Sequence, residues 1–433
     1  MVTSVRKGRS CRRSARRRRR LSVQAFLGIA VLIAFAWVIS EDRRRVKVGE
    51  VCLGLAVTIL MAVVMLKIPF LRYVFDLLNR GVSIIEESTR AGTSFVFGYL
   101  GGGTLPFDEK FGGSGFVLAL QALPIVLVVS ALSSLLFYWR ILPVVVRAFA
   151  WIFEKTMRVG GAVGLSAAAN VFLGQVESPL IVRPYLKEMT RCELFITMSC
   201  GMAGIAGTVM VLYASILRTM LPDAMGHILI VSIISIPACI TVSKVMVPET
   251  GPSTAGKLSP PCLATSAMDA ITQGTVDGIG LLINIVGMLV VLIALVYLAN
   301  RLLGFLPGLG GRPITLQRLL GYIMAPVVWL IGIPWSEAET AGGLMGTKTI
   351  LNEMIAYIDM AKLAPGALSE KSRLIMVYAL CGFANPGSLG IMIGGMGGMV
   401  PERKSEIIGL GVKSIIAGTL ATLLTGAIVG IIN

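Results

Sequence analysis

The sequence predicts an all-helical integral membrane protein. Hydrophobic residues make up 55% of the 433 positions, charged residues only 14%, and the mean hydropathy is +0.83. A soluble domain carries roughly 25% charged residues. Apolar runs of about the 20 residues that a helix needs to cross a bilayer recur along the chain, without the alternation of a strand. They are Leu21–Ser40, Val51–Pro69, Phe116–Tyr138, Ile228–Val247, Leu281–Leu303 and Ile407–Ile432.

The net charge of +16 comes largely from a short head. Residues 1–20 contain nine Arg and one Lys and no acidic residue, so the rest of the chain has 29 basic and 23 acidic residues. A polybasic head beside a membrane helix is typical of a lipid anchor or a topology signal. We expect residues 1–20 to be disordered and dispensable. Nucleic-acid binding is not expected, because it needs a folded basic surface.

Cysteine and histidine do not occur at the spacings that catalytic or metal-binding sites require. Seven cysteines are scattered without a C-x-x-C, and His227 is the single histidine, with no second ligand at helical spacing. His227 is therefore the one histidine that could form a Ser/His or Cys/His catalytic pair. We therefore expect neither catalytic residues nor a bound cofactor.

Other segments read as interfacial helices and loops. Leu71–Arg80 and Arg140–Arg158 have apolar residues at helical spacing with charges between them, as in helices that lie along a membrane surface. Gly101–Gly115 reads as an exposed loop. The Pro-, Ser- and Thr-rich residues 248–276 read as a long loop that divides the chain into two halves.

The two halves repeat one order of motifs. The first contains Gly174-Gln-Val-Glu-Ser-Pro-Leu in an apolar segment, a charged connector, and a helix interrupted by Cys200-Gly-Met-Ala-Gly. The second contains Gly346-Thr-Lys-Thr-Ile-Leu-Asn-Glu, a charged connector, and a helix interrupted by Cys381-Gly-Phe-Ala-Asn-Pro. Paired Gly- or Pro-interrupted segments in two halves of a membrane chain indicate a transporter with a central site.

Glu177 and Glu353 are the acidic residues of this repeat. A carboxylate at membrane depth costs several kcal/mol or more and is a functional candidate by default. Each lies in a segment too polar and too short for a plain span, which favours a re-entrant hairpin. The alternative is structural: Glu177 paired with Arg183, Glu353 paired with Lys348, and small residues that only let helices pack. Two matching sets in one chain favour the functional interpretation.

These motifs carry a family resemblance. The segments Ser166-Ala-Ala-Ala-Asn-Val-Phe-Leu-Gly-Gln-Val-Glu-Ser-Pro-Leu, Asn352-Glu-Met-Ile-Ala-Tyr, Cys381-Gly-Phe-Ala-Asn and Gly394-Gly-Met-Gly-Gly-Met-Val-Pro-Glu-Arg-Lys resemble the concentrative nucleoside transporter family, over nearly all of 21–433. The resemblance implies about eight transmembrane helices, two re-entrant hairpins, interfacial helices, an inverted repeat, a homotrimer, and a transport domain that moves past a scaffold.

The resemblance also divides the chain. We expect a basic head (1–20), scaffold and interfacial helices (21–158), a first transport half (159–247), a loop (248–276), scaffold helices (277–333), a second transport half (334–400) and a C-terminal helix (401–433). The protein would lie in a bacterial inner membrane, as a multi-pass protein in contact with lipid.

The site residues follow by position from the same resemblance. The nucleobase would contact Gln175, Val176, Glu177 and Val209, and the ribose would contact Glu353, Phe383, Asn385 and Ser388. A coupling cation would lie among Asn170, Leu173, Gly204 and Ile205. Three departures from the family pattern stand out: Val176 in place of Thr, Gly204 in place of Ser, and Pro386-Gly387 before Ser388.

The predicted function is a secondary active transporter that imports nucleosides by symport with sodium or protons. Sodium is favoured because Asn170 and the surrounding break are kept, although Gly204 provides no side-chain oxygen. A symporter of the same fold for another polar metabolite remains an alternative, because of the three departures. A channel is a further alternative, but the sequence lacks rings of charge or repeated filter loops.

Overall fold

The computed structural model describes residues 23–107, 115–218, 220–221, 223–252, 254, 264–308 and 313–433. The predicted head at 1–20 lies outside these residues. So do residues 108–114 of the loop expected at 101–115, and most of 253–263 in the long loop. Throughout the described part of the chain, the regular structure is helical.

The chain forms a series of helices, several of them short. After a first helix, Val23–Val38, come α2 Val48–Lys67, α3 Pro69–Phe97, η1 Gly98–Gly101, α4 Leu118–Gln121, α5 Ile125–Tyr138, α6 Ile141–Met157, α7 Gly161–Ala169, α8 Glu177–Ile181, η2 Arg183–Tyr185, α9 Arg191–Ala203, α10 Gly207–Leu217, α11 Ala224–Met246, α12 Ala267–Leu303, α13 Leu316–Leu330, α14 Trp335–Ile350, α15 Glu353–Ala361, α16 Glu370–Leu380, α17 Pro386–Met399, η3 Pro401–Arg403 and α18 Lys404–Ile432.

Six helical segments of the described chain are long and apolar enough to cross a membrane: α2, Leu118–Tyr138, Arg191–Leu217, α11, α12 and Pro401–Ile432. Two shorter apolar helices, Val23–Val38 and α13, accompany them. The prediction of an all-helical protein with several apolar helices is therefore confirmed.

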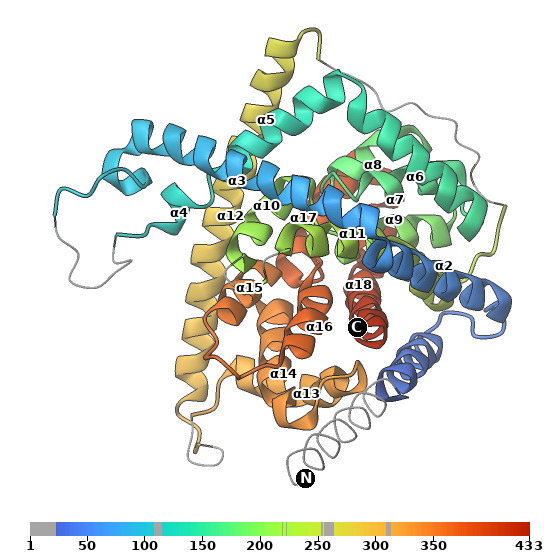
Figure 1. The fold of residues 1–433 in the computed structure, drawn as a ribbon. Helices are drawn as coiled ribbons and strands as arrows, with labels where there is room; N and C mark the ends of the chain where they lie inside the picture. Colours follow the sequence, from blue (N-terminus) through green and yellow to red (C-terminus); the bar gives the residue numbers. More distant parts are fainter. Residues whose placement is uncertain are drawn as a thin grey trace, which may run out of the picture.

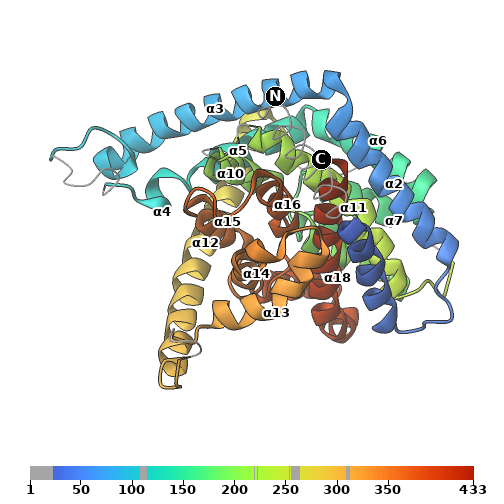
Figure 2. The same ribbon diagram turned by 60° about the horizontal axis from the view of Figure 1, so that its bottom comes forward.

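Helices α11 and α12 occupy opposite environments. In the apolar window of α11, 89% of the residues are buried, and α11 packs against α2, α9, α10 and α18. In that of α12 only 11% are buried, and α12 packs mainly on α5 along one side of the molecule (Figure 1). Helix α3 lies crosswise to α12 over one end of the molecule (Figures 1 and 2). The core is thus built around α11, and α12 presents its surface outward.

Two elements differ from the sequence-based expectation. Helix α12 begins at Ala267, inside the range 248–276 expected to be a loop, because the Ser266 hydroxyl caps it by accepting from the Asp269 N–H at 3.1 Å. The apolar run Phe116–Tyr138 is divided into α4 and α5 just before Ile125. Pro124 lacks the N–H that would continue the helical hydrogen bonds there.

A cluster of charges ties the loop after the first helix to later segments. Arg191 of α9 donates to both Glu41 carboxylate oxygens at 2.9 Å, and Lys413 of α18 donates to Oε1 at 2.6 Å. These partners, Arg191 first, hold the pKa of Glu41 at about 2, against the desolvation that raises it. The Glu41 N–H also donates to the carbonyl of Met246, at the end of α11. The first two helices are thereby fastened to α9, α11 and α18.

Candidate functional site: a cavity between two broken helices

Two helices break where their sequences contain Gly and Pro. Helix α9 ends at Ala203 and α10 resumes at Gly207, whereas α16 ends at Leu380 and α17 resumes at Pro386. The two breaks meet, because the Phe383 N–H donates to the Gly204 carbonyl at 3.2 Å. Breaks of this kind free backbone groups that lipid cannot satisfy, so they occur inside protein or beside a cavity.

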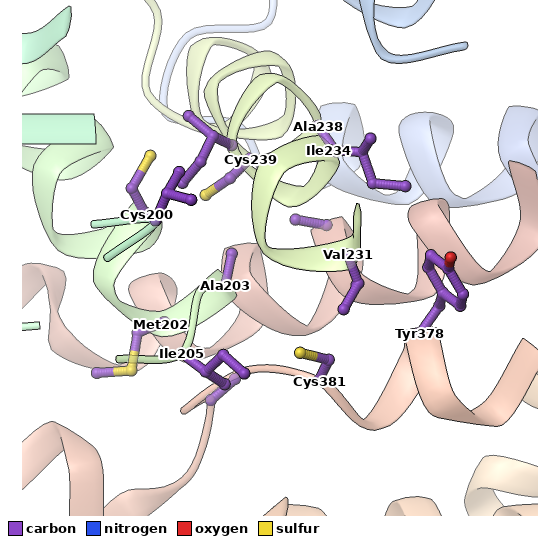
Figure 3. Packing of buried hydrophobic residues seen from close by; sticks show 14 of the residues in the cluster. Cys200, Met202, Ala203, Ile205, Val231, Ile234, Ala238, Cys239, Tyr378 and Cys381 are labelled. Atoms are coloured by element: carbon purple, nitrogen blue, oxygen red, sulfur yellow. The ribbon is translucent and has the colours of Figure 1, made fainter. Parts of the chain in front are cut away.

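Gly382 allows the breaks to approach each other. Its φ is +143°, and a Cβ there would lie 2.8 Å from the Ala203 carbonyl oxygen. Figure 3 shows the packing around this crossing, where the side chains of the breaks gather beside α11. The labelled residues are Cys200, Met202, Ala203, Ile205 and Cys381 at the breaks, Val231, Ile234, Ala238 and Cys239 of α11, and Tyr378 of α16.

A helical hairpin precedes each broken helix. In the first half, α7 ends at Ala169 and a turn leads to Glu177 at the start of α8. Its Phe172 carbonyl accepts from the Gly207 N–H at 2.9 Å, so the turn is held against the start of α10. In the second half, α14 ends at Ile350 and Asn352 caps α15, whose first residue is Glu353. Each predicted carboxylate therefore follows a hairpin turn that faces a break.

A cavity of about 960 Å³ opens between these turns, the breaks, α5 and α12. All eight residues that the sequence assigned to substrate binding line this one cavity, although they are spread over more than 200 positions. They are Gln175, Val176, Glu177, Val209, Glu353, Phe383, Asn385 and Ser388.

Glu353 forms the most ordered polar group of the cavity. The residue is 3% exposed, and its carboxylate accepts from the Tyr213 hydroxyl at 2.5 Å and from the Asn385 Nδ2 at 3.3 Å. The Asn385 Oδ1 in turn accepts from the Ser388 N–H at 2.9 Å, which caps α17. The carboxylate is therefore fixed in orientation, and free lone pairs remain for hydroxyl donors in the cavity.

Glu177 has a different environment. Its side chain is exposed to the cavity. Its Oε2 lies so close to Gly174 that a Cβ on that glycine would be 2.1 Å from the oxygen. Its electrostatic neighbours are the backbone of the hairpin turn and Asp277 of α12. Glu177 is thus accessible to a ligand, whereas Glu353 is held by partners of its own.

The first hairpin turn and the start of α10 each contribute to the cavity lining a polar atom without a partner. The Gln175 Oε1 and the Thr208 Oγ1 are buried and have no hydrogen-bond partner within the described residues, and both residues line the cavity. Val176 packs closely against Gly395 of α17, because a Cβ on that glycine would lie 2.6 Å from the Val176 Cγ1. Buried polar groups are normally paired, so these two atoms can form hydrogen bonds with a ligand or with water.

Three of the four predicted cation residues do not line the cavity, and Leu173 is the exception. The Asn170 Nδ2 donates to the Cys200 carbonyl in the last turn of α9 at 2.5 Å, and the Ser178 hydroxyl donates to the Asn170 Oδ1 at 3.3 Å. Gly204 adjoins this group, since a Cβ there would lie 2.3 Å from the Asn170 Nδ2. The structure therefore brings Asn170, Gly204 and the end of α9 together.

The alternative interpretation, in which the two acids form structural ion pairs, does not fit these contacts. Among the described residues, no salt bridge joins Glu177 to Arg183 or Glu353 to Lys348. Lys348 instead donates to the Ala379 carbonyl and the Thr422 hydroxyl. Sequence reasoning overlooked Thr208, Tyr213 and Asp277. Thr208 and Tyr213 lie in an apolar helix where hydroxyls are common, and only the position of Thr208 beside Val209 signalled a role.

Family models match most of the chain. The model described as Na+ dependent nucleoside transporter C-terminus matches residues 227–430, and the corresponding N-terminus model matches residues 27–100. A third model, described as nucleoside recognition, matches residues 119–220.

Relatives and solved structures agree with these models. The chain is 36% identical to an uncharacterized transporter of Haemophilus influenzae, over 94% of this chain and 97% of that protein. It is 32% identical to the nucleoside permease NupC of Helicobacter pylori, over 95% and 97%. The structure of CNTnw in an inward-facing substrate-bound state superposes with a TM-score of 0.86 at 34% identity, covering 95% of this chain and 98% of that one.

We expect Gly382→Ala to destabilise the protein by about 1–3 kcal/mol, because the substitution strains a backbone conformation that other residues rarely adopt. The added Cβ also meets the Ala203 carbonyl. The matched control is Gly390→Ala in α17, where a Cβ meets nothing within 4 Å. This control should be neutral or slightly stabilising, as Gly→Ala is within helices. Thermal unfolding of the detergent-solubilised variants measures both, and equal midpoints would contradict the role of Gly382.

Proposed function

The chain belongs to the family of Na+-dependent nucleoside transporters, and on that premise we propose that it imports nucleosides by symport with sodium ions. Its relatives are transporters and permeases, so the chain is a multi-pass cell-membrane transporter and not an enzyme.

The observation that supports a nucleoside substrate is that the cavity lining contains two kinds of polar group. One is the Glu353 carboxylate, oriented by Tyr213 and Asn385, and charged acceptors make the stronger hydrogen bonds to hydroxyls. The other consists of the unpartnered Gln175 amide oxygen and Thr208 hydroxyl. A nucleoside offers partners for both, because its ribose carries hydroxyl donors and its base carries amide-like groups. We therefore assign the ribose to Glu353, Asn385, Phe383 and Ser388, and the base to Gln175, Val176, Glu177, Val209 and Thr208.

We expect Glu177→Gln and Glu353→Gln each to reduce nucleoside uptake at least tenfold while leaving the protein folded. Loss of a charged hydrogen-bond partner costs about 1.5–3 kcal/mol, and 1.4 kcal/mol is a factor of ten. The control is Glu339→Gln, which removes an exposed carboxylate of α14. Uptake of a panel of labelled nucleosides into proteoliposomes measures the effect.

Two results would contradict this assignment. If both glutamine variants take up nucleosides at the wild-type rate, the carboxylates do not hold the substrate. If the wild type takes up no nucleoside under a sodium gradient or a proton gradient but transports another polar metabolite, the fold serves a different substrate.

Sodium is the coupling ion that the group around Asn170 suits. Hard cations prefer oxygen ligands, and the Asn170 side chain lies beside the carbonyl end of α9, where the helix dipole is negative. The Asn170 amide and the carbonyls of Leu173, Cys200 and Ile205 are the available ligands. The Gly204 carbonyl already accepts from Phe383. A cation would replace the Asn170 amide hydrogen now bonded to Cys200.

We expect uptake to depend on sodium, and Gly204→Ser to lower the sodium concentration for half-maximal uptake relative to Gly204→Ala. Both variants add a Cβ that must displace the Asn170 amide, but only Ser adds an oxygen ligand. The alanine variant therefore isolates the steric cost. Sodium titrations of uptake compare the two. Uptake that ignores sodium and follows an imposed pH gradient would mean that protons are coupled instead.

The surface of α12 supports a homotrimer. Val276, Ile283, Val290 and Tyr297 are spaced seven residues apart, and each is more than 60% exposed. Ile279 and Ile293 lie between them on the same face and are also exposed. Apolar residues at such spacing form helix–helix seams, and β-branched residues at both alternating positions favour three strands over two. We assign α12 to a central trimer contact and to a fixed scaffold, past which the hairpins and broken helices move as an elevator.

We expect Ile283→Cys to form inter-protomer disulfides on oxidation, visible as cross-linked dimers on a non-reducing gel, with uptake retained. Three α12 helices around one axis bring equivalent residues together, and a fixed scaffold tolerates the link. The control is Met268→Cys, near the start of α12, also exposed. Only monomers, or loss of uptake on cross-linking, would contradict the scaffold assignment.

A further inference from the structure

Lys348 is a buried lysine that the proposed site does not use. It lies near the end of α14, and 1% of it is exposed. Its ammonium donates to the Ala379 carbonyl at 2.9 Å and to the Thr422 Oγ1 at 3.0 Å. The Thr422 hydroxyl donates its own hydrogen to the Thr419 carbonyl at 3.0 Å, so its lone pair faces the lysine. In the described part of the chain, no carboxylate forms a salt bridge with Lys348.

The surroundings of the ammonium are those of a cation site. Ala379 lies in the last turn of α16, directly before the second break. The last carbonyls of a helix lack intrahelical partners and carry the negative end of its dipole. The Glu353 carboxylate adds an electrostatic attraction from the same hairpin. A carbonyl and a hydroxyl oxygen therefore contact the ammonium, and a carboxylate attracts it without touching it.

The first half contains a corresponding arrangement. Asn170, from the first hairpin, donates its Nδ2 to the Cys200 carbonyl in the last turn of α9, directly before the first break. In each half, then, a hairpin side chain reaches the carbonyl end of a broken helix. The reaching group is a neutral amide in the first half and an ammonium in the second.

We propose that Lys348 is a tethered cation, which takes at the second break the place that a free coupling cation takes at the first. This inference rests on the proposed function. Lys348 acts as a positioning residue: by neutralising the end of α16 it holds the Cys381–Asn385 turn, and with it Phe383 and Asn385 at the ribose end. Because the second break already contains its cation, a single free cation accompanies each nucleoside.

The first test separates charge from packing at this position. Purified Lys348→Ala is assayed in detergent for equilibrium binding of labelled uridine and adenosine, with n-propylammonium or n-propanol added. The two additives are similar in size, but only the first is charged. We expect the variant to bind nucleoside at least tenfold more weakly than the wild type. Propylammonium should recover binding at least threefold, and propanol should not.

Two control variants accompany this assay. Lys348→Met fills the space without the charge and should bind as weakly as the alanine variant. Thr422→Val removes one acceptor but leaves the ammonium on Ala379, and should change binding less than threefold. Wild-type affinity in Lys348→Met, or equal recovery by propanol and propylammonium, would overturn the proposal.

The second test needs no variant, so it decides the matter if the lysine variants fail to fold. The charge moved per nucleoside is measured in wild-type proteoliposomes from the membrane potential at which net uptake reverses. A ratio of one is expected, and a ratio of two would overturn the proposal because a second free cation would be required. A wild type that takes up no nucleoside contradicts the proposed function instead.

Discussion

The hydrogen bond from the Phe383 N–H to the Gly204 carbonyl is the contact on which the site depends. It joins two helix breaks that lie far apart in the sequence, and it forms only because Gly382 adopts a φ of +143° beside the Ala203 carbonyl. Once the breaks cross, the ends of four helices converge inside the molecule. The carbonyl ends of α9 and α16 face Asn170 and Lys348, whereas α10 and α17 begin beside the cavity. The same crossing thereby separates the helix carbonyl ends, where the proposed cation positions lie, from the cavity proposed for the substrate.

The rest of the fold supports this crossing from opposite sides. Helix α11 is almost entirely buried and packs against α9, α10 and α18, so the breaks rest on a rigid centre. Helix α12 closes the far wall of the cavity and exposes an apolar face along its length. The cavity has α10 and α12 among its walls, and these two helices differ greatly in burial. Relative movement of the two walls would open and close the cavity, as the proposed elevator mechanism requires.

Much of this arrangement could be predicted from the sequence, because its strongest signals are local. Acids in apolar segments and Gly- or Pro-interrupted helices identified Glu177, Glu353 and both breaks. The other six residues assigned to the substrate came from the family resemblance, and all eight line one cavity. The missing parts depend on tertiary contacts. A Lys348–Glu353 pair was the structural alternative, but Lys348 donates to the Ala379 carbonyl at a helix end, which no spacing reveals. Likewise, Ser266 begins α12 within a Pro- and Ser-rich stretch, where composition outweighs a single capping residue.

The central claim is that the crossed breaks create one nucleoside site with a ribose end and a base end. A cryo-EM map of the protein in lipid nanodiscs, with sodium and saturating uridine or adenosine, tests it most directly. Ligand density is expected in the cavity, with the ribose hydroxyls on Glu353 and Asn385 and the base against Gln175 and Thr208. Density in the reverse orientation, or density confined to the α5 and α12 side of the cavity, would contradict it.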